Sequence, residues 1–334
     1  MKQFKQLNKF KSFFLAVFFV LIGSSLSMAN DLWKGPFEIK NQFPLTSDLL
    51  SPEPEKASIY DKDTGDGTLS LSYSSIYIFN SSPSWDVGMD MEIAELTYSY
   101  RRGITDYLEV GGEVPVLSFR GGFMDSFLSD YHRLFGFPDY GRSERPRNSF
   151  LYYLRRDGKD IILPEDNKIG LGDISLYGKF ALKKGDPNIS VKLMVEAPTG
   201  NAKKGFGNGS WDYGISLLMD KELLQSVKLY GGVGLILPGN LKGYEKIHLN
   251  PYPYGFIALE KSFGDWSLIG QMQVAKSPFP KTGIKQIDNI AVSGTGGVKY
   301  RISNNHILSF SLSEDVNLSG APDVTFNLSL KEFF

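Results

Sequence analysis

The chain has 334 residues, of which 42% are hydrophobic and 22% charged, so it is not a disordered chain. Its 36 basic and 37 acidic residues leave no positive excess of the kind that nucleic-acid binding requires, and no nucleic-acid partner is expected. The absence of cysteine excludes disulfides, thiolate metal sites and lipid attachment at cysteine.

The first 29 residues have the pattern of a secretory signal peptide. Lysines at positions 2, 5, 9 and 11 precede an apolar run at 13–22, and small residues end at Ala29, where cleavage is expected. The alternative, a membrane anchor, is disfavoured because a run of about ten residues is too short to span a bilayer. We therefore expect an exported protein.

Residues 30–67 form a proline-rich lead-in that is expected to be periplasmic or lumenal. Pro36, Pro44, Pro52 and Pro54 interrupt it, and proline has no N–H for a β-ladder. Its end, 61–67, superficially resembles a calcium loop, but the glycine falls one position late and the final glutamate is missing. No metal and no cofactor is therefore expected.

From residue 68 onward, segments that alternate apolar and polar residues recur between turn signals, as expected for β-strands. Twelve such segments occur, at 68–80, 88–101, 105–118, 169–183, 187–197, 210–220, 226–237, 252–263, 265–276, 288–301, 306–314 and 322–334. After residue 22 no apolar run approaches the roughly 18 residues of a membrane helix. Because lipid permits only helices and closed barrels, the predicted fold is all-β: a transmembrane antiparallel β-barrel of about 12 strands over 68–334.

The connections support this prediction, because bacterial barrels have short periplasmic turns and longer extracellular loops. If the first strand runs outward, the inner connections at 102–104, 184–186, 221–225, 264 and 303–305 are all short. The outer connections, at 81–87, 119–168, 198–209, 238–251, 277–287 and 315–321, are longer.

Alternation also assigns the two faces of each strand. Charged residues are expected to face the lumen, because a Lys or Arg at the bilayer midplane costs roughly 2–4 kcal/mol. In the strand at 187–197, this rule turns Leu193 to lipid. The residues predicted to line the lumen are Glu109, Glu113, Asp173, Lys179, Lys192, Glu196, Asp212, Lys228, Lys299 and Arg301. Alternation slips near Ser74-Ser75 and Ala94-Glu95, where we expect bulges.

The outer connection at 119–168 is long enough to be functional. Its apolar residues recur at helical spacing, which predicts a long amphipathic helix, followed by a hairpin that turns at Asp157-Gly158. We expect this helix to form a lid over the lumen mouth. The alternative is an extracellular cap that does not close the lumen. The predicted lid residues are Phe123, Phe127, Tyr131, His132, Leu134 and Phe135.

The last strand ends on an aromatic residue, as in the C-terminal signal of outer-membrane barrels. Its apolar positions are Phe326, Leu328, Leu330 and Phe334, which alternate with polar residues up to the chain end. This strand predicts insertion in the bacterial outer membrane by the barrel-assembly machinery. Contact with membrane lipid is also expected. Arg142, Arg145 and Arg147 are candidates for binding the phosphate groups of lipopolysaccharide.

Several stretches resemble a bacterial outer-membrane family filed as domain of unknown function 3187. These stretches lie at 35–37, 121–125, 135–142, 170–173, 197–200 and 321–326, so the resemblance covers nearly all of the mature chain. It implies an outer-membrane barrel. It implies no reaction and no catalytic residue, because the family has no established activity.

The sequence therefore predicts a narrow passive channel or uptake protein for small solutes, with the long loop as its lid. A structural outer-membrane protein with an occluded lumen is the first alternative. A less favoured alternative is a lipid hydrolase that pairs His132 with Ser129, which lie three residues apart on the expected helix. No enzyme activity is expected otherwise.

Overall fold

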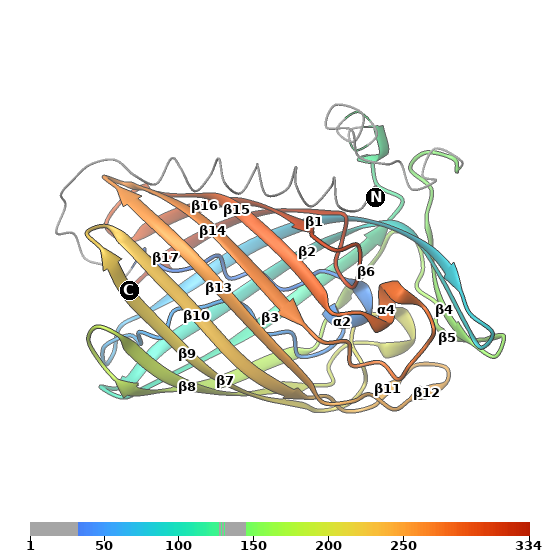
Figure 1. The fold of residues 1–334 in the computed structure, drawn as a ribbon, viewed down its shortest axis with the longest axis horizontal. Coiled ribbons are helices and arrows are strands. Elements are labelled where there is room, and N and C mark those ends of the chain that lie inside the picture. Colours follow the sequence, from blue (N-terminus) through green and yellow to red (C-terminus); the bar gives the residue numbers. More distant parts are fainter. Residues whose placement is uncertain (1–32, 127, 129, 131–144) are drawn as a thin grey trace.

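The computed structural model describes residues 33–126, 128, 130 and 145–334, and these fold mainly into strands around a closed barrel (Figure 1). The twelve wall strands are β1 (Gly65–Ser81), β2 (Trp85–Thr105), β3 (Leu108–Arg120), β7 (Ile174–Lys183), β8 (Asn188–Ala197), β9 (Asp212–Leu224), β10 (Val227–Leu237), β13 (Tyr252–Phe263), β14 (Trp266–Ala275), β15 (Ala291–Arg301), β16 (His306–Asp315) and β17 (Val324–Phe333).

Each wall strand pairs antiparallel with its two neighbours, and β17 pairs with β1 to close the barrel. In that closing pair Leu69 lies opposite Leu330, so apolar residues of the first and last strands meet on one face. Closure leaves no strand edge in the wall, as a bilayer requires. The predicted antiparallel barrel of about 12 strands is confirmed.

Short elements gather at one end of the barrel, at the right of Figure 1, whereas the C-terminus and the tight turns lie at the other end. We refer to the right-hand end, which carries the long connections, as the outer end. Its elements are β4 (Leu151–Arg156), β5 (Lys159–Ile162), β6 (Lys168–Leu171), β11 (Leu241–Lys242), β12 (Lys246–Ile247), α2 (Pro44–Ser47), α4 (Lys285–Asp288) and the 3₁₀ turn η3 (Ala202–Lys204).

The predicted strand boundaries agree closely with the structure in most of the wall. The segment 252–263 coincides with β13, whereas 169–183 is broken at Gly172-Asp173 into β6 and β7. The first outer connection is shorter than predicted, because β1 and β2 extend until only Ser82–Ser84 separate them. The connections at the inner end are all short, so the two ends of the barrel can be distinguished by the length of their loops.

The expected bulges near Ser74 and Ala94 are wrong, because the β1–β2 register runs through both positions without a shift. The slip in alternation has another cause. Near the outer end, the polar side chain of Glu92 points away from the lumen and accepts the N–H groups of Phe123 and Met124, at 2.9 and 2.5 Å. A polar residue is tolerated on the outer wall there because another segment of the chain covers it.

The long helical loop is not supported. Asp125, Ser126, Leu128 and Asp130 are helical, but the α-helices with described bounds are the short α2 and α4, and no helix among the described residues is long and apolar enough to cross a bilayer. Within 119–168, Met124 and Leu128 pack on the outer wall against Val324 rather than over the mouth. Phe123 also lies on the outer wall, stacked on Tyr73 with ring centroids 5.3 Å apart.

The predicted hairpin at 150–163 is present as β4 and β5. Asp157 and Gly158, which join them, both have positive φ, at 50° and 76°. A tight two-residue hairpin turn requires positive φ at both of its central residues. Asp-Gly is a sequence that adopts this conformation readily. β4 pairs with the outer end of β2, so the hairpin continues the sheet beyond the closed part of the wall.

The outward face of the wall is apolar over its middle. Leu193 on β8, Leu176 on β7 and Ile215 on β9 are each about half exposed on this face. Their neighbours along each strand, such as Lys192, are buried inside. This is the sorting expected of strands that separate lipid from an enclosed interior.

This sorting leads to a prediction about Leu193. Replacing it with Arg places a charge in mid-bilayer, and we expect the barrel to lose about 2–4 kcal/mol of folding free energy. The measurement is urea-induced unfolding of the protein refolded in lipid vesicles. Leu224→Arg, at the exposed turn end of β9, is the matched control and should cost only about 0–1 kcal/mol. Equal losses in the two variants would contradict the proposed membrane position.

Candidate functional site: a lumen filled by the N-terminal segment

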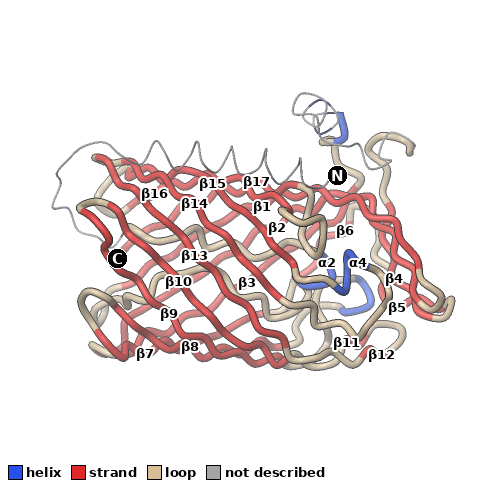
Figure 2. The backbone as a smooth tube through the Cα atoms, in the orientation of Figure 1, coloured by secondary structure: helices blue, strands red, loops and turns tan. Residues whose placement is uncertain are grey.

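Residues 33–60, which we call the internal segment, lie inside the barrel. In Figure 2 the tan path of this segment runs between the red strands, turns at the blue helix α2 and runs back toward the C-terminal end. An ascending arm therefore precedes α2 and a descending arm follows it. The segment contains no strand, as its prolines predict. Its enclosed backbone must find hydrogen-bond partners elsewhere.

The ascending arm obtains these partners from side chains of the wall. Glu260 accepts the N–H of Gly35 at 2.9 Å. Gln271 uses both ends of its amide on Phe37, accepting from its N–H at 2.9 Å and donating to its carbonyl at 3.1 Å. Lys299 donates to the carbonyl of Gly35 at 2.8 Å. Wall side chains thus replace the ladder that a strand would have had.

The descending arm is held in the same way by wall carboxylates. Asp212 accepts the N–H of Leu50 at 3.0 Å, and Asp220 accepts the N–H of Ala57 at 2.6 Å. Among the described residues, no backbone-to-backbone hydrogen bond joins residues 33–60 to a wall strand. The segment is therefore attached through side chains and can detach without breaking the barrel ladder.

A cluster of four charges anchors the ascending arm near the inner end. Glu38 of the segment pairs with Arg101 at 2.7 Å and with Lys331 at 3.0 Å. Arg101 also pairs with Asp66 at 2.9 Å. Arg101 and Asp66 are both buried, so each depends on its partners for the interactions that water would otherwise provide.

A second cluster anchors the descending arm. Glu55 pairs with Lys192 at 3.0 Å and with Lys179 at 3.5 Å, and Lys179 pairs with Glu109 at 2.9 Å. Lys192 also lies 3.8 Å above the ring centroid of Tyr177. Two positive and two negative charges meet here, so the cluster is neutral only while Glu55 remains in place.

The predicted lumen residues are therefore found in several environments. Six of them contact the internal segment through ion pairs or hydrogen bonds: Glu109, Glu113, Lys179, Lys192, Asp212 and Lys299. Glu196 is buried with one carboxylate oxygen unpaired, Lys228 is half-buried on β10, and Asp173 lies in the break between β6 and β7. Arg301 lies at the inner rim and pairs with Asp265 at 2.6 Å.

The sequence predictions missed the other half of this site. Glu38 and Glu55 fall in the lead-in that is predicted to be periplasmic or lumenal, with no role assigned to them, and Arg101, Asp66 and Glu260 are absent from the predicted lumen residues. A signal existed for two of them, because Asp66 and Arg101 are in phase with the lumen-facing polar residues of their strands. No periodic signal existed for Glu38 or Glu55, because their segment is not periodic.

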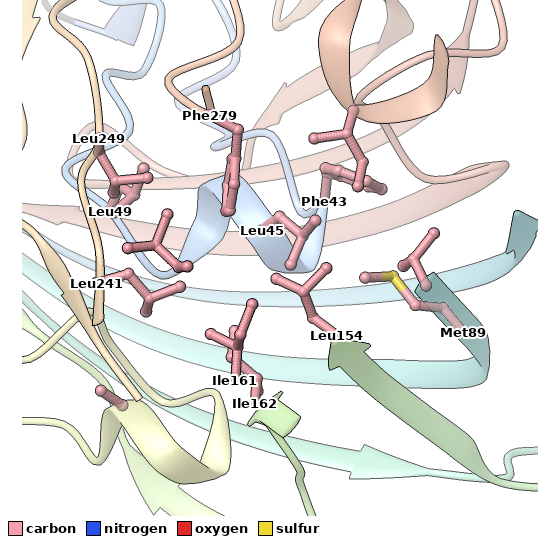
Figure 3. Close-up of a cluster of buried hydrophobic side chains, with 14 of the residues drawn as sticks. Phe43, Leu45, Leu49, Met89, Leu154, Ile161, Ile162, Leu241, Leu249 and Phe279 are labelled. Atoms are coloured by element: carbon pink, nitrogen blue, oxygen red, sulfur yellow. The ribbon is translucent and has the colours of Figure 1, made fainter. Parts of the chain in front are cut away.

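The outer half of the lumen is apolar, and we call this cluster the outer core. Figure 3 shows α2 at its centre, with Phe43, Leu45 and Leu49 of the internal segment directed toward surrounding side chains. Those partners include Leu154, Ile161, Ile162, Leu241, Leu249 and Phe279. The tip of the internal segment therefore closes the outer end with buried hydrocarbon.

The β4–β5 hairpin covers this core from outside. Its Ile161 carbonyl accepts the N–H of Tyr244 at 2.9 Å, and the Leu163 N–H donates to the carbonyl of Lys203 at 3.1 Å. These bonds tie the hairpin to loops that follow β10 and β8. The part of 119–168 that covers the mouth is thus the hairpin. Of the predicted lid residues, Phe127, Tyr131, His132, Leu134 and Phe135 lie outside the described residues.

Between the ascending arm and β1, β2, β16 and β17 lies a polar cavity. Hydroxyl and amide side chains, among them Ser72, Thr97 and Asn327, form one side, whereas Lys40 and Glu113 form part of the other. Its volume is about 30 Å³, enough for a few water molecules at ~10–15 Å³ each. While the internal segment is in place, the cavity is therefore too small to hold anything larger than these water molecules.

Asp48 follows α2 at the tip of the internal segment and is buried there. Neither of its carboxylate oxygens has a hydrogen-bond partner among the described residues. Burial, reinforced by the charges of Asp173 and Glu196, raises the pKa of Asp48 well above its usual value. Burial also raises the pKa of Asp173 to about 6, although it accepts N–H bonds from Gly200 and Asn208, which lower it.

The described histidines bear on the hydrolase alternative. His306 Nδ1 lies 3.0 Å from Ser303 Oγ, and its Nε2 lies 3.7 Å from Glu332. These groups are on an exposed turn, where Ser303 Oγ also accepts the N–H of Asn305 at 3.2 Å. That arrangement is typical of a hydroxyl that stabilises a turn. His248 contacts Asn240 at 2.9 Å, and the predicted His132–Ser129 pair lies outside the described residues.

The residues of the predicted C-terminal signal are spread along β17, from Phe326 near the outer end to Phe334 at the inner end. Leu328 and Leu330 are exposed on the outward face, and Phe326 lies against the cluster formed by Met124 and Leu128. The ring of Phe334 stacks on Tyr100, with centroids 5.5 Å apart. The assembly signal assigned to this strand remains a prediction.

The closed wall, its apolar outward band and its charged interior define a transmembrane β-barrel of the outer-membrane type. The chain belongs to the family described as "Protein of unknown function (DUF3187)", which matches residues 13–334. No curated protein matches its sequence.

Comparison with solved structures finds similarity to an outer-membrane channel and to a porin. The COG4313 outer membrane channel from Pseudomonas putida F1 is 13% identical, with a TM-score of 0.58 over 84% of this chain and 99% of that one. The NanC porin is 7% identical, with a TM-score of 0.46 over 80% of this chain and 98% of that one. At 13% identity, the likeness to the first of these structures supports the fold alone.

The charge cluster at Glu38 yields a test of how the segment is held. Glu38→Gln removes one of the two carboxylates that both Arg101 and Lys331 contact, the other being Asp66, and loss of one partner from a buried pair costs up to about 3–5 kcal/mol. We expect amides of the ascending arm to exchange with solvent faster, while wall amides do not change. Hydrogen exchange followed by mass spectrometry measures this.

The matched control is Asp63→Asn, which removes a carboxylate from Arg102 in an exposed pair. An exposed pair contributes about 0–1 kcal/mol, so exchange should stay near that of the unmodified protein. If Glu38→Gln behaves like Asp63→Asn, the buried cluster does not hold the arm.

Docking of the tip should depend on pH. Because docking buries Asp48 and raises its pKa, the docked state binds this proton more tightly, so docking is strongest at low pH and weakens as pH rises above the usual range of an aspartate. Asp48→Asn should slow protease cleavage within residues 33–60 at about pH 7.5 and flatten the pH profile, because the amide has no proton to lose. Asp61→Asn, at an exposed site, is the control. Faster cleavage in Asp48→Asn would contradict this assignment.

Proposed function

We propose that the protein is a passive outer-membrane channel for small solutes, and that the internal segment is its closing element. The observation that carries this proposal is a charged lumen occupied by a segment that belongs to no strand and is attached by side chains. Eight-stranded barrels are filled by their own side chains, and sixteen-stranded barrels leave an aqueous channel. Twelve strands leave a narrow space, which this chain fills with a separate piece of backbone.

The chemistry of the contacts supports a reversible closure. A segment paired to the wall as a thirteenth strand would leave only with the loss of a whole ladder. Here each contact involves a side chain, such as Glu55 with Lys192 or Asp212 with the Leu50 N–H. Charged groups on both sides can be hydrated once they separate. Conduction then requires the tip to leave the outer core.

A structural barrel with a permanently occluded lumen is the second candidate. The outer core favours it, because Phe43, Leu45 and Leu49 are almost completely buried. Burial of such side chains stabilises by roughly 1.5–3 kcal/mol each, so the closed state must greatly outweigh the open one. The two candidates differ in whether the tip ever opens a conducting path.

Conductance of the refolded protein in planar bilayers distinguishes these candidates. The unmodified protein should conduct rarely, whereas Phe43→Ser combined with Leu45→Ser should increase the open fraction at least about tenfold, because a loss of 1.4 kcal/mol already gives that factor. Phe123→Ser is the control. That residue lies on the outer wall, so its replacement should leave the current unchanged.

Two results would contradict the proposal. If the double variant becomes protease-sensitive within residues 33–60 but passes no current, the protein is a structural barrel. If Phe123→Ser alone raises the current, the closing element is the loop that follows β3 rather than the internal segment.

A further inference from the structure

A second cavity lies between the internal segment and the inner surface of β13, β14 and β15, beside the outer core. Phe43 and Leu45 line it on the side of the internal segment, and Tyr252, Phe256 and Phe279 line it from the wall and its loops. Four of these five side chains also belong to the outer core. The cavity therefore adjoins the part of the segment that closes the outer end.

The lining of this cavity differs in charge from that of the polar cavity. Its polar side chains are neutral amides and hydroxyls, such as Asn41, Gln273 and Ser293, and its single charged residue, Lys276, is exposed. The polar cavity has seven charged residues: Glu38, Lys40, Glu53, Glu95, Glu113, Lys299 and Lys331. A charged molecule would find counter-charges in the polar cavity but not beside Phe43.

Aromatic side chains with a few neutral polar groups are the usual lining of a small-molecule site. We propose that this cavity binds a small, uncharged and mainly apolar molecule that carries one hydrogen-bonding group, such as a substituted benzene. The inference rests on the proposed channel function in one respect only: it names the class of solute that the channel would admit.

Binding at this site is coupled to the internal segment by geometry. The cavity volume is about 40 Å³, which holds only about three water molecules at ~10–15 Å³ each. An aromatic ring can enter only if Phe43 and Leu45 move away from the wall. The ligand thus replaces contacts of the tip with contacts of its own, and it favours the open state.

The probe for this site is 4-fluorobenzyl alcohol, observed by fluorine NMR with the full chain in lipid nanodiscs. 4-Fluorobenzoate, which has the same ring and a negative charge, is the comparison. The alcohol should show a saturable bound signal at one equivalent, and the benzoate should bind at least about tenfold more weakly. Empty nanodiscs give the background from partition into lipid.

Two variants on β14 separate the cavity from the membrane. Ala275→Phe fills the cavity and should weaken binding at least about tenfold. Met272→Phe adds the same ring on the outward face and should leave binding unchanged. Should Ala275→Phe fail to fold, Ser293→Asp provides the second test, because a carboxylate in the lining should also weaken binding of the alcohol.

The outcomes separate this inference from the channel function. A signal that is the same in Ala275→Phe, Met272→Phe and empty nanodiscs is lipid partition only and overturns the site, whether or not the protein conducts. Saturable binding that Ala275→Phe abolishes supports the site even if no variant conducts, in which case the channel function falls. Binding accompanied by a higher open fraction in the presence of the alcohol supports both.

Discussion

The structure depends on one constraint, which is that a polar backbone group cannot remain unpaired away from water. In the wall, this constraint is met by a closed ladder in which β17 pairs with β1. In the lumen it is met differently, because the internal segment contains prolines and does not join the ladder. Side chains such as Gln271 and Asp220 supply the missing donors and acceptors. The same requirement thus produces a wall joined by a backbone ladder and an internal segment held by side chains.

The internal segment divides the lumen along its length. Near the inner end, Glu38 and Glu55 neutralise basic residues of the wall, whereas at the outer end Phe43 and Leu45 bury hydrocarbon. Charged contacts become less costly to break when water enters, but apolar contacts do not. In the proposed channel, the tip therefore determines the closed state, and the arms limit how far the segment moves once the tip is free.

The outer loops contribute to the closed state in an indirect way. The β4–β5 hairpin extends β2 and supplies Leu154, Ile161 and Ile162 to the outer core, so it holds the tip rather than forming a separate lid. The chain before this hairpin contacts the outside of the wall, where it covers the carboxylate of Glu92. One long connection thus stabilises both surfaces of the barrel at its outer end.

The sequence by itself determined the wall. Period-two alternation is a local property of each strand, so twelve strands, their boundaries and the outward direction of Leu193 could be predicted without knowledge of any contact. The C-terminal strand, with Leu328 and Leu330 outward, follows from the same rule. Burial of lumen residues such as Lys179 and Lys192 also agrees with this alternation.

Only the tertiary structure decided what fills the wall. Residues 33–60 have no periodicity, and the partners of Glu38 lie 63 and 293 positions away in the chain. A segment held by single side chains leaves no repeating pattern from which its position could be read. For the same reason, the helical spacing that begins at Phe123 could not indicate which surface it meets: spacing defines an apolar face, but its partner is set by the fold.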